Sequence, residues 1–154
     1  MKKLTVFESP EAIVDVYPEV KLVYLTWRSG AAGSAFRAPV EHLIEATRVH
    51  GLEYFLSDTR RMGPILFADT EWTERKALPQ LIQAGMRRSA VLTSHDVLTN
   101  IAVDNMVASI PREAPYVVQY FAEPEPALQW LYKNAPAGVP DLQAPPIVDP
   151  IRRG

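Results

Sequence analysis

The chain has 154 residues, 47% of them hydrophobic and 22% charged, which suits one globular domain with a sizeable core and is short for two. Its 16 Lys and Arg against 18 Asp and Glu give a formal charge of −2, which argues against a nucleic-acid binder that relies on a basic face. There is no cysteine, so disulfides, thiolate catalysis, iron–sulfur clusters and Cys-ligated zinc are excluded. Charged residues interrupt every apolar run, and we expect a cytoplasmic protein without a signal peptide or a transmembrane segment.

The N-terminal part of the sequence is rich in residues that favour strands. Strands are predicted at residues 4–7, 13–17 and 21–27, with turns around Pro10 and Pro18. Residues 22–27 are apolar on both faces, which is typical of a strand in the middle of a sheet that is covered on each side.

After Gly30, predicted helices and strands alternate. The expected elements are a helix whose first turn holds Pro39 and which ends at Gly51, a strand at 52–57, a helix beginning near Asp69, a strand at 89–93, a helix at 97–109, a strand at 116–121 and a helix at 124–133. This order is typical of βαβ units. It predicts an α/β fold with a mixed, mainly parallel sheet, antiparallel strands at its N-terminal side and helices packed on it.

Three helical details follow from single residues. Pro79 has no N–H to donate to the carbonyl of Arg75, so a kink or a break is expected there. Asp96 is the expected N-cap of the helix at 97–109, and Val97, Ile101 and Val107 are predicted among its inward-facing residues. In the last helix, Ala127, Trp130 and Leu131 share one face, which predicts that Trp130 anchors it to the sheet.

Residues 134–154 form a separate segment beyond the predicted domain of residues 1–133. Five prolines there exclude a regular helix or a central strand and predict an extended tail. Its apolar anchors are Leu142, Ile147, Val148 and Ile151. These can dock on the chain's own domain or on the second subunit of a homodimer, since extended arms commonly embrace a neighbouring subunit.

Four local patterns lie between Leu22 and Leu131. They are a strand at 23–27 followed by Ser34-Ala35-Phe36-Arg37, a strand ending in Ser57-Asp58-Thr59-Arg60, a segment from Glu71-Trp72 through Leu78-Pro79 and Gly85-Met86-Arg87-Arg88 into Ala90-Val91-Leu92, and Phe121 with Ala127 and Trp130-Leu131. In this order the patterns resemble the STAS-like proteins, which include the SpoIIAA-like anti-sigma-factor antagonists and border on the SEC14-like lipid carriers. The resemblance implies a non-enzymatic regulatory or protein-interaction domain.

The resemblance also implies a site of regulation that this sequence alters. In the antagonists a partner kinase phosphorylates a serine in an Asp-Ser-Ser-Gly-like turn after a central strand. The corresponding residues here are Asp58-Thr59-Arg60-Arg61, in which arginines replace the small residues that expose the acceptor. We therefore expect that Thr59 is not a working phosphorylation switch.

Polar residues follow three predicted parallel strands, at the sheet edge where ligands bind in open α/β folds. They are Arg28, Asp58, Thr59, Arg60, Ser94, His95 and Asp96. Two interpretations stay open: a site for an anionic ligand or a partner, or caps and ion pairs that serve the structure. Ser94-His95-Asp96 is not a catalytic triad, because adjacent residues leaving a strand point in different directions.

The sequence predicts neither a metal nor another cofactor. His42 with Glu41 and Glu45 offers too few converging ligands, and Gly30-Ala31-Ala32-Gly33 lacks the spacing and the Lys-Ser/Thr of a phosphate loop. Three functions stay open: a STAS-like regulatory or interaction domain, a SEC14-like carrier of a small apolar or lipid-like ligand, and an enzyme that uses the strand-end Asp, Arg and His residues. An apolar pocket would favour the carrier.

Overall fold

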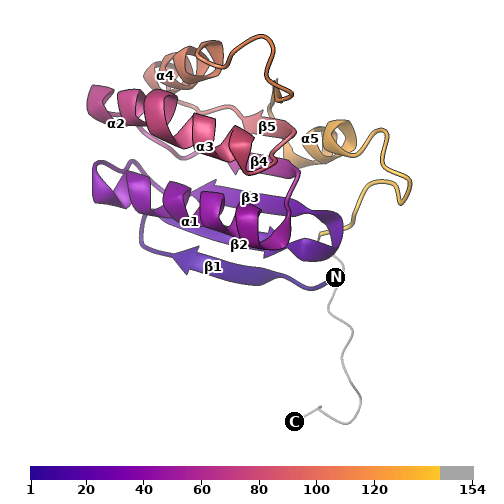
Figure 1. The fold of residues 1–154 in the computed structure, drawn as a ribbon. Coiled ribbons are helices and arrows are strands. Elements are labelled where there is room, and N and C mark those ends of the chain that lie inside the picture. The colour runs from indigo at the N-terminus through magenta and orange to yellow at the C-terminus, as the bar shows by residue number, and fades with distance from the viewer. Residues whose placement is uncertain (143–154) are drawn as a thin grey trace, which may run out of the picture.

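The computed structural model describes residues 1–142 and has a six-stranded sheet as its centre (Figure 1). The strands are β1 (Leu4–Glu8), β2 (Ala12–Tyr17), β3 (Leu22–Trp27), β4 (Tyr54–Asp58), β5 (Arg88–Leu92) and β6 (Val117–Phe121). They lie side by side in chain order, with β1, β2 and β3 antiparallel and β3 to β6 parallel. The predicted α/β fold with a mixed sheet is confirmed.

The helices divide between the two faces of the sheet. They are α1 (Ser34–His50), α2 (Phe67–Trp72), the π-helix η2 (Thr73–Ala77), α3 (Leu78–Gln83), α4 (Val97–Ala108) and α5 (Pro124–Leu131), with a short 3-10 helix, η1 (Pro18–Val20). Because each parallel crossover advances one strand in the same direction and crossovers are right-handed, α1, α2, α3 and α4 fall on one face. The last helix, α5, lies on the other (Figure 1).

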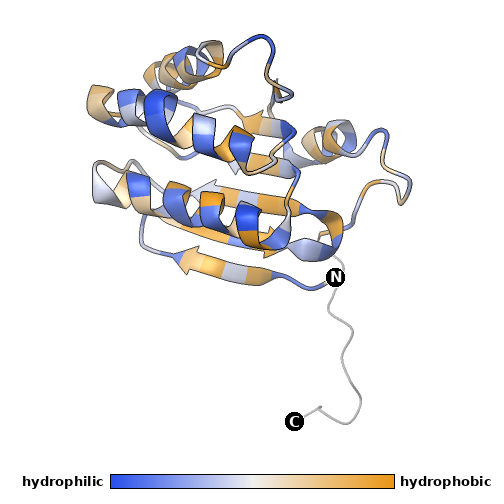
Figure 2. Cartoon of the chain, viewed as in Figure 1, coloured by the Kyte–Doolittle hydropathy of each residue, from blue (hydrophilic) through white to orange (hydrophobic). Residues whose placement is uncertain are grey.

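Two apolar clusters correspond to these two faces. The larger lies under α1 and α3 and includes Val14, Leu25 and Leu43, whereas the smaller joins Leu56 and Leu131 beneath α5. Figure 2 shows the apolar residues concentrated in the central strands and the hydrophilic ones on the outer side of α1. The sheet is therefore covered on both faces at β4 and β5, as the apolar central strands require.

Two proline predictions had different outcomes. At Pro79 the prediction is confirmed, because the regular helix is interrupted by η2 immediately before the proline, which then takes the first turn of α3. Placing Pro39 in the first turn of α1 was wrong. The helix begins at Ser34, where the Gly33 carbonyl accepts hydrogen bonds from the N–H groups of Phe36 and Arg37, so Pro39 lies inside it.

The orientation of α4 differs from the prediction. Val97 and Ile101, predicted to face inward, are 69% and 52% exposed, and Thr99 and Met106 are the buried residues of the helix. The reason is that α4 carries apolar residues on every side, so its hydropathy pattern does not indicate which face packs. The N-cap prediction is confirmed, since an Asp96 carboxylate oxygen accepts a hydrogen bond from the Thr99 N–H at 3.0 Å.

The last helix packs on the sheet through Ala127, Leu128 and Leu131 as well as through the predicted Trp130. Ala127, Leu128 and Leu131 are buried, whereas Trp130 is only partly buried and packs against the ring of Phe121. Beyond the helix, Leu142 packs on the smaller apolar cluster of the same chain. The other predicted anchors, Ile147, Val148 and Ile151, lie outside the described residues. Within residues 1–142 we find no helix with the length and apolar character needed to cross a membrane.

Candidate functional site

Four of the seven predicted site residues lie together in a polar groove at the carboxyl edge of the sheet. We call this the strand-end groove; it is lined by Thr26, Trp27, Arg28, Asp58, Arg60, Arg61 and His95. The predicted members are Arg28, Asp58, Arg60 and His95. They come from the ends of β3, β4 and β5, which parallel pairing brings to one edge.

An ion pair at the end of β4 forms part of the wall of this groove. The Arg60 guanidinium donates through Nε to Asp58 Oδ1 at 3.0 Å and through Nη2 to Oδ2 at 2.9 Å, and the Arg60 backbone N–H donates to Oδ1 at 3.1 Å. The hydrogen bond to Asp58 raises the pKa of Arg60. Since both Asp58 oxygens accept from Arg60, the carboxylate is held as a structural partner of the arginine.

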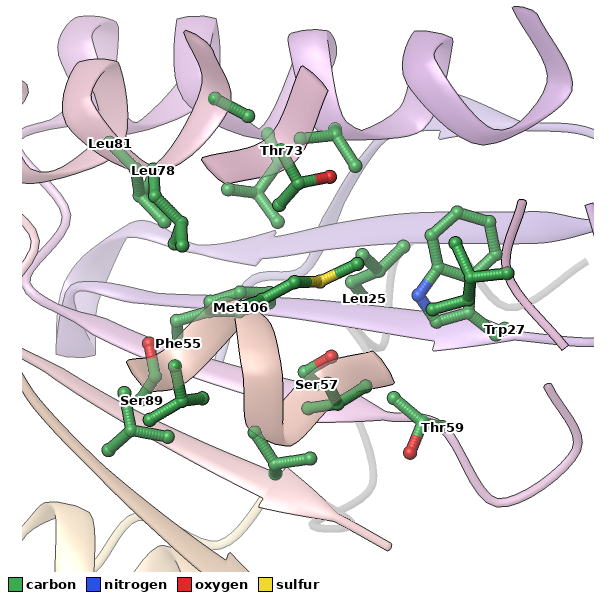
Figure 3. A pocket seen from close by; sticks show the side chains of 18 of the residues that line it. Leu25, Trp27, Phe55, Ser57, Thr59, Thr73, Leu78, Leu81, Ser89 and Met106 are labelled. Carbon is green, nitrogen blue, oxygen red and sulfur yellow. The ribbon is translucent and has the colours of Figure 1, made fainter. Parts of the chain in front are cut away.

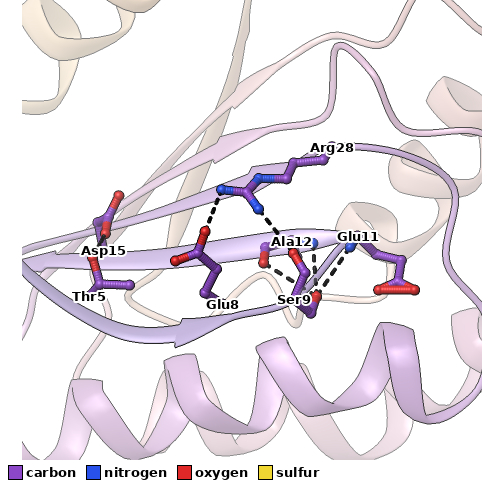
Figure 4. A network of polar contacts seen from close by, with 7 residues as sticks. All are labelled: Thr5, Glu8, Ser9, Glu11, Ala12, Asp15 and Arg28. Carbon is purple, nitrogen blue, oxygen red and sulfur yellow. Dashed lines mark hydrogen bonds and ion pairs between the residues drawn. The ribbon is translucent and has the colours of Figure 1, made fainter.

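Arg28 is restrained by the β1–β2 turn (Figure 4). Its guanidinium donates to Glu8 Oε2 at 2.9 Å and to the Ser9 carbonyl at 3.0 Å. The turn itself is ordered by Ser9 Oγ, which accepts hydrogen bonds from the N–H groups of Glu11 and Ala12. Two arginines of the groove are thus paired with carboxylates, and the arrangement agrees with the structural interpretation of these residues.

The other three predicted site residues do not line the groove. Thr59 is buried, and its hydroxyl donates to the Leu92 carbonyl at 2.6 Å. Ser94 donates to the Met62 carbonyl at 2.9 Å and accepts from the Asp96 N–H, while Asp96 caps α4. These side chains fix the connections that follow β4 and β5.

A second space, which the sequence analysis did not find, lies between the sheet and the helices α1, α3 and α4. We call it the helix-side cavity; its volume is about 120 Å³. Most of its lining is apolar and comes from several elements, including Leu25, Phe36, Leu81 and Met106 (Figure 3). It is therefore a space inside the larger apolar cluster and separate from the strand-end groove.

Most of the polar groups in the cavity wall are satisfied by the protein. Thr59 bonds to the Leu92 carbonyl, and the Thr73 hydroxyl donates to the Asp69 carbonyl at 2.8 Å. The hydroxyls of Ser89 and Tyr116 bond to each other, and burial raises the pKa of Tyr116 to about 12.

Ser57 is the exception among these hydroxyls. It is only 8% exposed and points into the cavity (Figure 3). Within residues 1–142, its hydroxyl makes no hydrogen bond with another protein group, and its oxygen is accessible from the cavity. The sequence signal that could have found this wall is a group of three hydroxyl residues, Ser57 in β4, Thr59 just after it and Ser89 in β5, which all line the cavity.

Comparison with known proteins adds no relative: no family model matches, and neither the curated proteins nor the solved structures contain a significant match. In the described part of the chain, no three His, Asp or Glu side chains are placed to hold a metal ion.

Proposed function

We propose that this protein is a non-enzymatic STAS-like domain that binds a small apolar molecule in the helix-side cavity. The observation that supports this proposal is the cavity lining, which is almost wholly apolar and contains one hydroxyl, on Ser57, that no protein group satisfies. Ligand sites are typically apolar with a few placed polar groups. Of the three functions left open by the sequence, this is the carrier, with SEC14-like proteins as its analogues.

The size of the cavity limits the ligand. An apolar cavity of roughly 150 Å³ binds benzene, and drug-sized ligands need roughly 300 Å³ or more. At about 120 Å³ the helix-side cavity suits a compact molecule about as large as a single ring. Met106 lies across it (Figure 3), and the flexible methionine side chain gives its wall some adaptability.

The wall formed by α4 offers a route for entry. Only Thr99 and Met106 of this helix are buried, whereas Val103 and Val107, which line the cavity, are partly exposed. A helix with few buried residues opens at lower free energy than a fully packed one. Outward movement of α4 would expose the cavity without disturbing the sheet.

Titration of the isotope-labelled protein with benzene, followed by NMR, tests this proposal. We expect saturable shifts at residues that line the cavity. Val103→Phe should abolish them because the ring fills the space, and Val107→Phe is a second filling variant in case the first does not fold. Val49→Phe is the matched control, since Val49 lies on α1, is 66% exposed and does not line the cavity. A wild-type protein without saturable shifts would contradict the proposal.

A protein-interaction role has its own supporting observation. Val97, Leu98 and Ile101 expose apolar side chains on the outer side of α4, and adjacent exposed apolar residues are typical of contact surfaces. The partner we propose is a second copy of the chain in a cytoplasmic homodimer. Sedimentation equilibrium of the wild type and Ile101→Lys tests this: the charged variant should shift the equilibrium toward monomer. Identical behaviour of the two proteins would exclude α4 as the contact.

A further inference from the structure

The position of Ser57 in the sheet is unusual for a hydroxyl. It is the penultimate residue of β4, on the face that α1, α3 and α4 cover, and is level with Leu25 on β3 and Val91 on β5. Both neighbours are buried apolar residues, and an apolar side chain would fit the pattern equally well. The Ser57 oxygen is open to the cavity and is not a fully buried unpaired atom, so a molecule inside the cavity can reach it.

No other protein group pairs with the Ser57 hydroxyl. The other hydroxyls of the wall, on Thr59, Thr73, Ser89 and Tyr116, are engaged in hydrogen bonds with each other or with the backbone. Most of the cavity lining is apolar, so Ser57 is the polar group of the wall that is free to pair with a molecule inside it. Its partner would be a polar group on whatever occupies the cavity.

We infer that the ligand of the helix-side cavity is a compact apolar molecule with a single hydroxyl or carbonyl group, which hydrogen-bonds to Ser57 Oγ. This inference rests on the proposed function and narrows its ligand to one chemical class. The Ser57 hydroxyl both donates and accepts, so it pairs with an alcohol, a phenol or a ketone. The single hydroxyl fixes one end of the molecule, while Leu25, Phe36 and Met106 contact the rest.

Benzene and phenol are the probes that test it, because they share a ring and differ by one hydroxyl. The measured quantity is the ratio of their dissociation constants, obtained from NMR titrations of the wild type and of Ser57→Ala. Taking the ratio in both proteins cancels the different hydration of the two probes. We expect the preference for phenol to fall about three- to tenfold in Ser57→Ala, the usual range for one neutral hydrogen bond. Benzene should bind the variant at least as tightly as the wild type.

The control for Ser57→Ala is a serine that lies outside the cavity. Ser29→Ala makes the same chemical change at an exposed position outside the cavity lining and should leave the ratio unaltered. An unchanged ratio in Ser57→Ala, with benzene still bound, would overturn the role of Ser57 and leave the proposed function standing. Failure of both probes to bind the wild type would overturn the proposed function itself.

Discussion

The carboxylate of Asp69 in α2 holds the entrance of α1 through the backbone of Gly33. Asp69 Oδ2 accepts a hydrogen bond from the Gly33 N–H at 2.9 Å, and Oδ1 accepts from Arg37 Nε at 3.1 Å. Gly33 has φ +60°, a left-handed conformation that favours glycine. The sequence predicted Asp69 only as a helix start, whereas its side chain is 1% exposed and ties two helices together.

Asp69→Ala should therefore destabilise the protein by about 2–3 kcal/mol, because it removes an acceptor of two charge-assisted hydrogen bonds and leaves a backbone N–H unpaired. Chemical denaturation measures this difference. Glu71→Ala is the control: its carboxylate is 42% exposed and 3.8 Å from Arg75, and a change of at most about 0.5 kcal/mol is expected. Equal effects of the two substitutions would show that Asp69 does not clamp the helices.

The last helix gives a prediction that reverses the sequence-based one. Trp130 was expected to be the anchor, with a cost of about 3–5 kcal/mol on truncation. Since Trp130 is partly buried and Leu131 is 1% exposed, we expect Leu131→Ala to cost about 2–4 kcal/mol and Trp130→Ala less than that. Urea unfolding curves of the two variants show which substitution lowers the free energy of unfolding more. A larger loss of stability in Trp130→Ala would mean that the contacts of Trp130 with Phe121 and Arg88 contribute most to holding the helix on the sheet.

Stability should fall at alkaline pH because of buried tyrosines, of which Tyr116 and Tyr132 are two. Burial raises the pKa of Tyr116 from 10 to about 12, so the folded state retains the phenol proton after the unfolded chain has lost it. The contribution is fully present below pH 10 and is lost as the pH rises through about 12, at about 1.4 kcal/mol per pH unit. Unfolding curves between pH 9 and 12 measure the slope.

Tyr116→Phe should flatten this alkaline slope, although the unpaired Ser89 hydroxyl lowers stability by about 1 kcal/mol at neutral pH. Tyr120→Phe serves for comparison. Its pKa is also raised to about 12, by burial and by its hydrogen bond to Asp104, but the residue is 38% exposed and should change the slope less. A slope that Tyr116→Phe leaves intact would assign the alkaline loss to other groups.

Thr59 should carry no stoichiometric phosphate in the host. Its side chain is 3% exposed and its hydroxyl donates to the Leu92 carbonyl, so a kinase reaches it only after the β4 end opens. Phosphoproteomics at several growth stages measures the occupancy directly. Thr59→Glu, which buries a charge at the same point, should unfold the protein, whereas Thr59→Ser keeps the hydroxyl and should fold. Stoichiometric phosphate that varies with growth would restore the antagonist-like switch.

Removal of the tail after Lys133 tests how residues 134–154 are held. Leu142 packs on the chain's own smaller cluster, so the truncated protein should be less stable even as a monomer. If the tail also reaches a second subunit, the full-length protein is a dimer and the truncated one a monomer by light scattering. A full-length protein that is monomeric at micromolar concentration would rule out the homodimer. A truncated protein that is still a dimer would show that the tail is not the dimer contact.

Local sequence patterns determined the order and type of most elements. Three of these features follow from the geometry of one residue and its immediate neighbours. They are the left-handed Gly51 that ends α1, the N-cap Asp96 of α4 and the helix break at Pro79. Alternation of strands and helices then predicted the parallel part of the sheet, and the strand-end residues Arg28, Asp58 and Arg60 were correctly expected at one edge. None of these features depends on how distant side chains fill space.

Tertiary structure alone decided which face of α4 packs, whether Trp130 or Leu131 is the anchor, and where a cavity is left. A helix that is apolar on all sides has no preferred face until its neighbours are in place. A cavity is a difference between the volume that several elements enclose and the volume that their side chains fill, and no single segment encodes it. Ser57 was therefore an ordinary strand residue in the sequence, and became a candidate ligand contact only when α1, α3 and α4 closed around it.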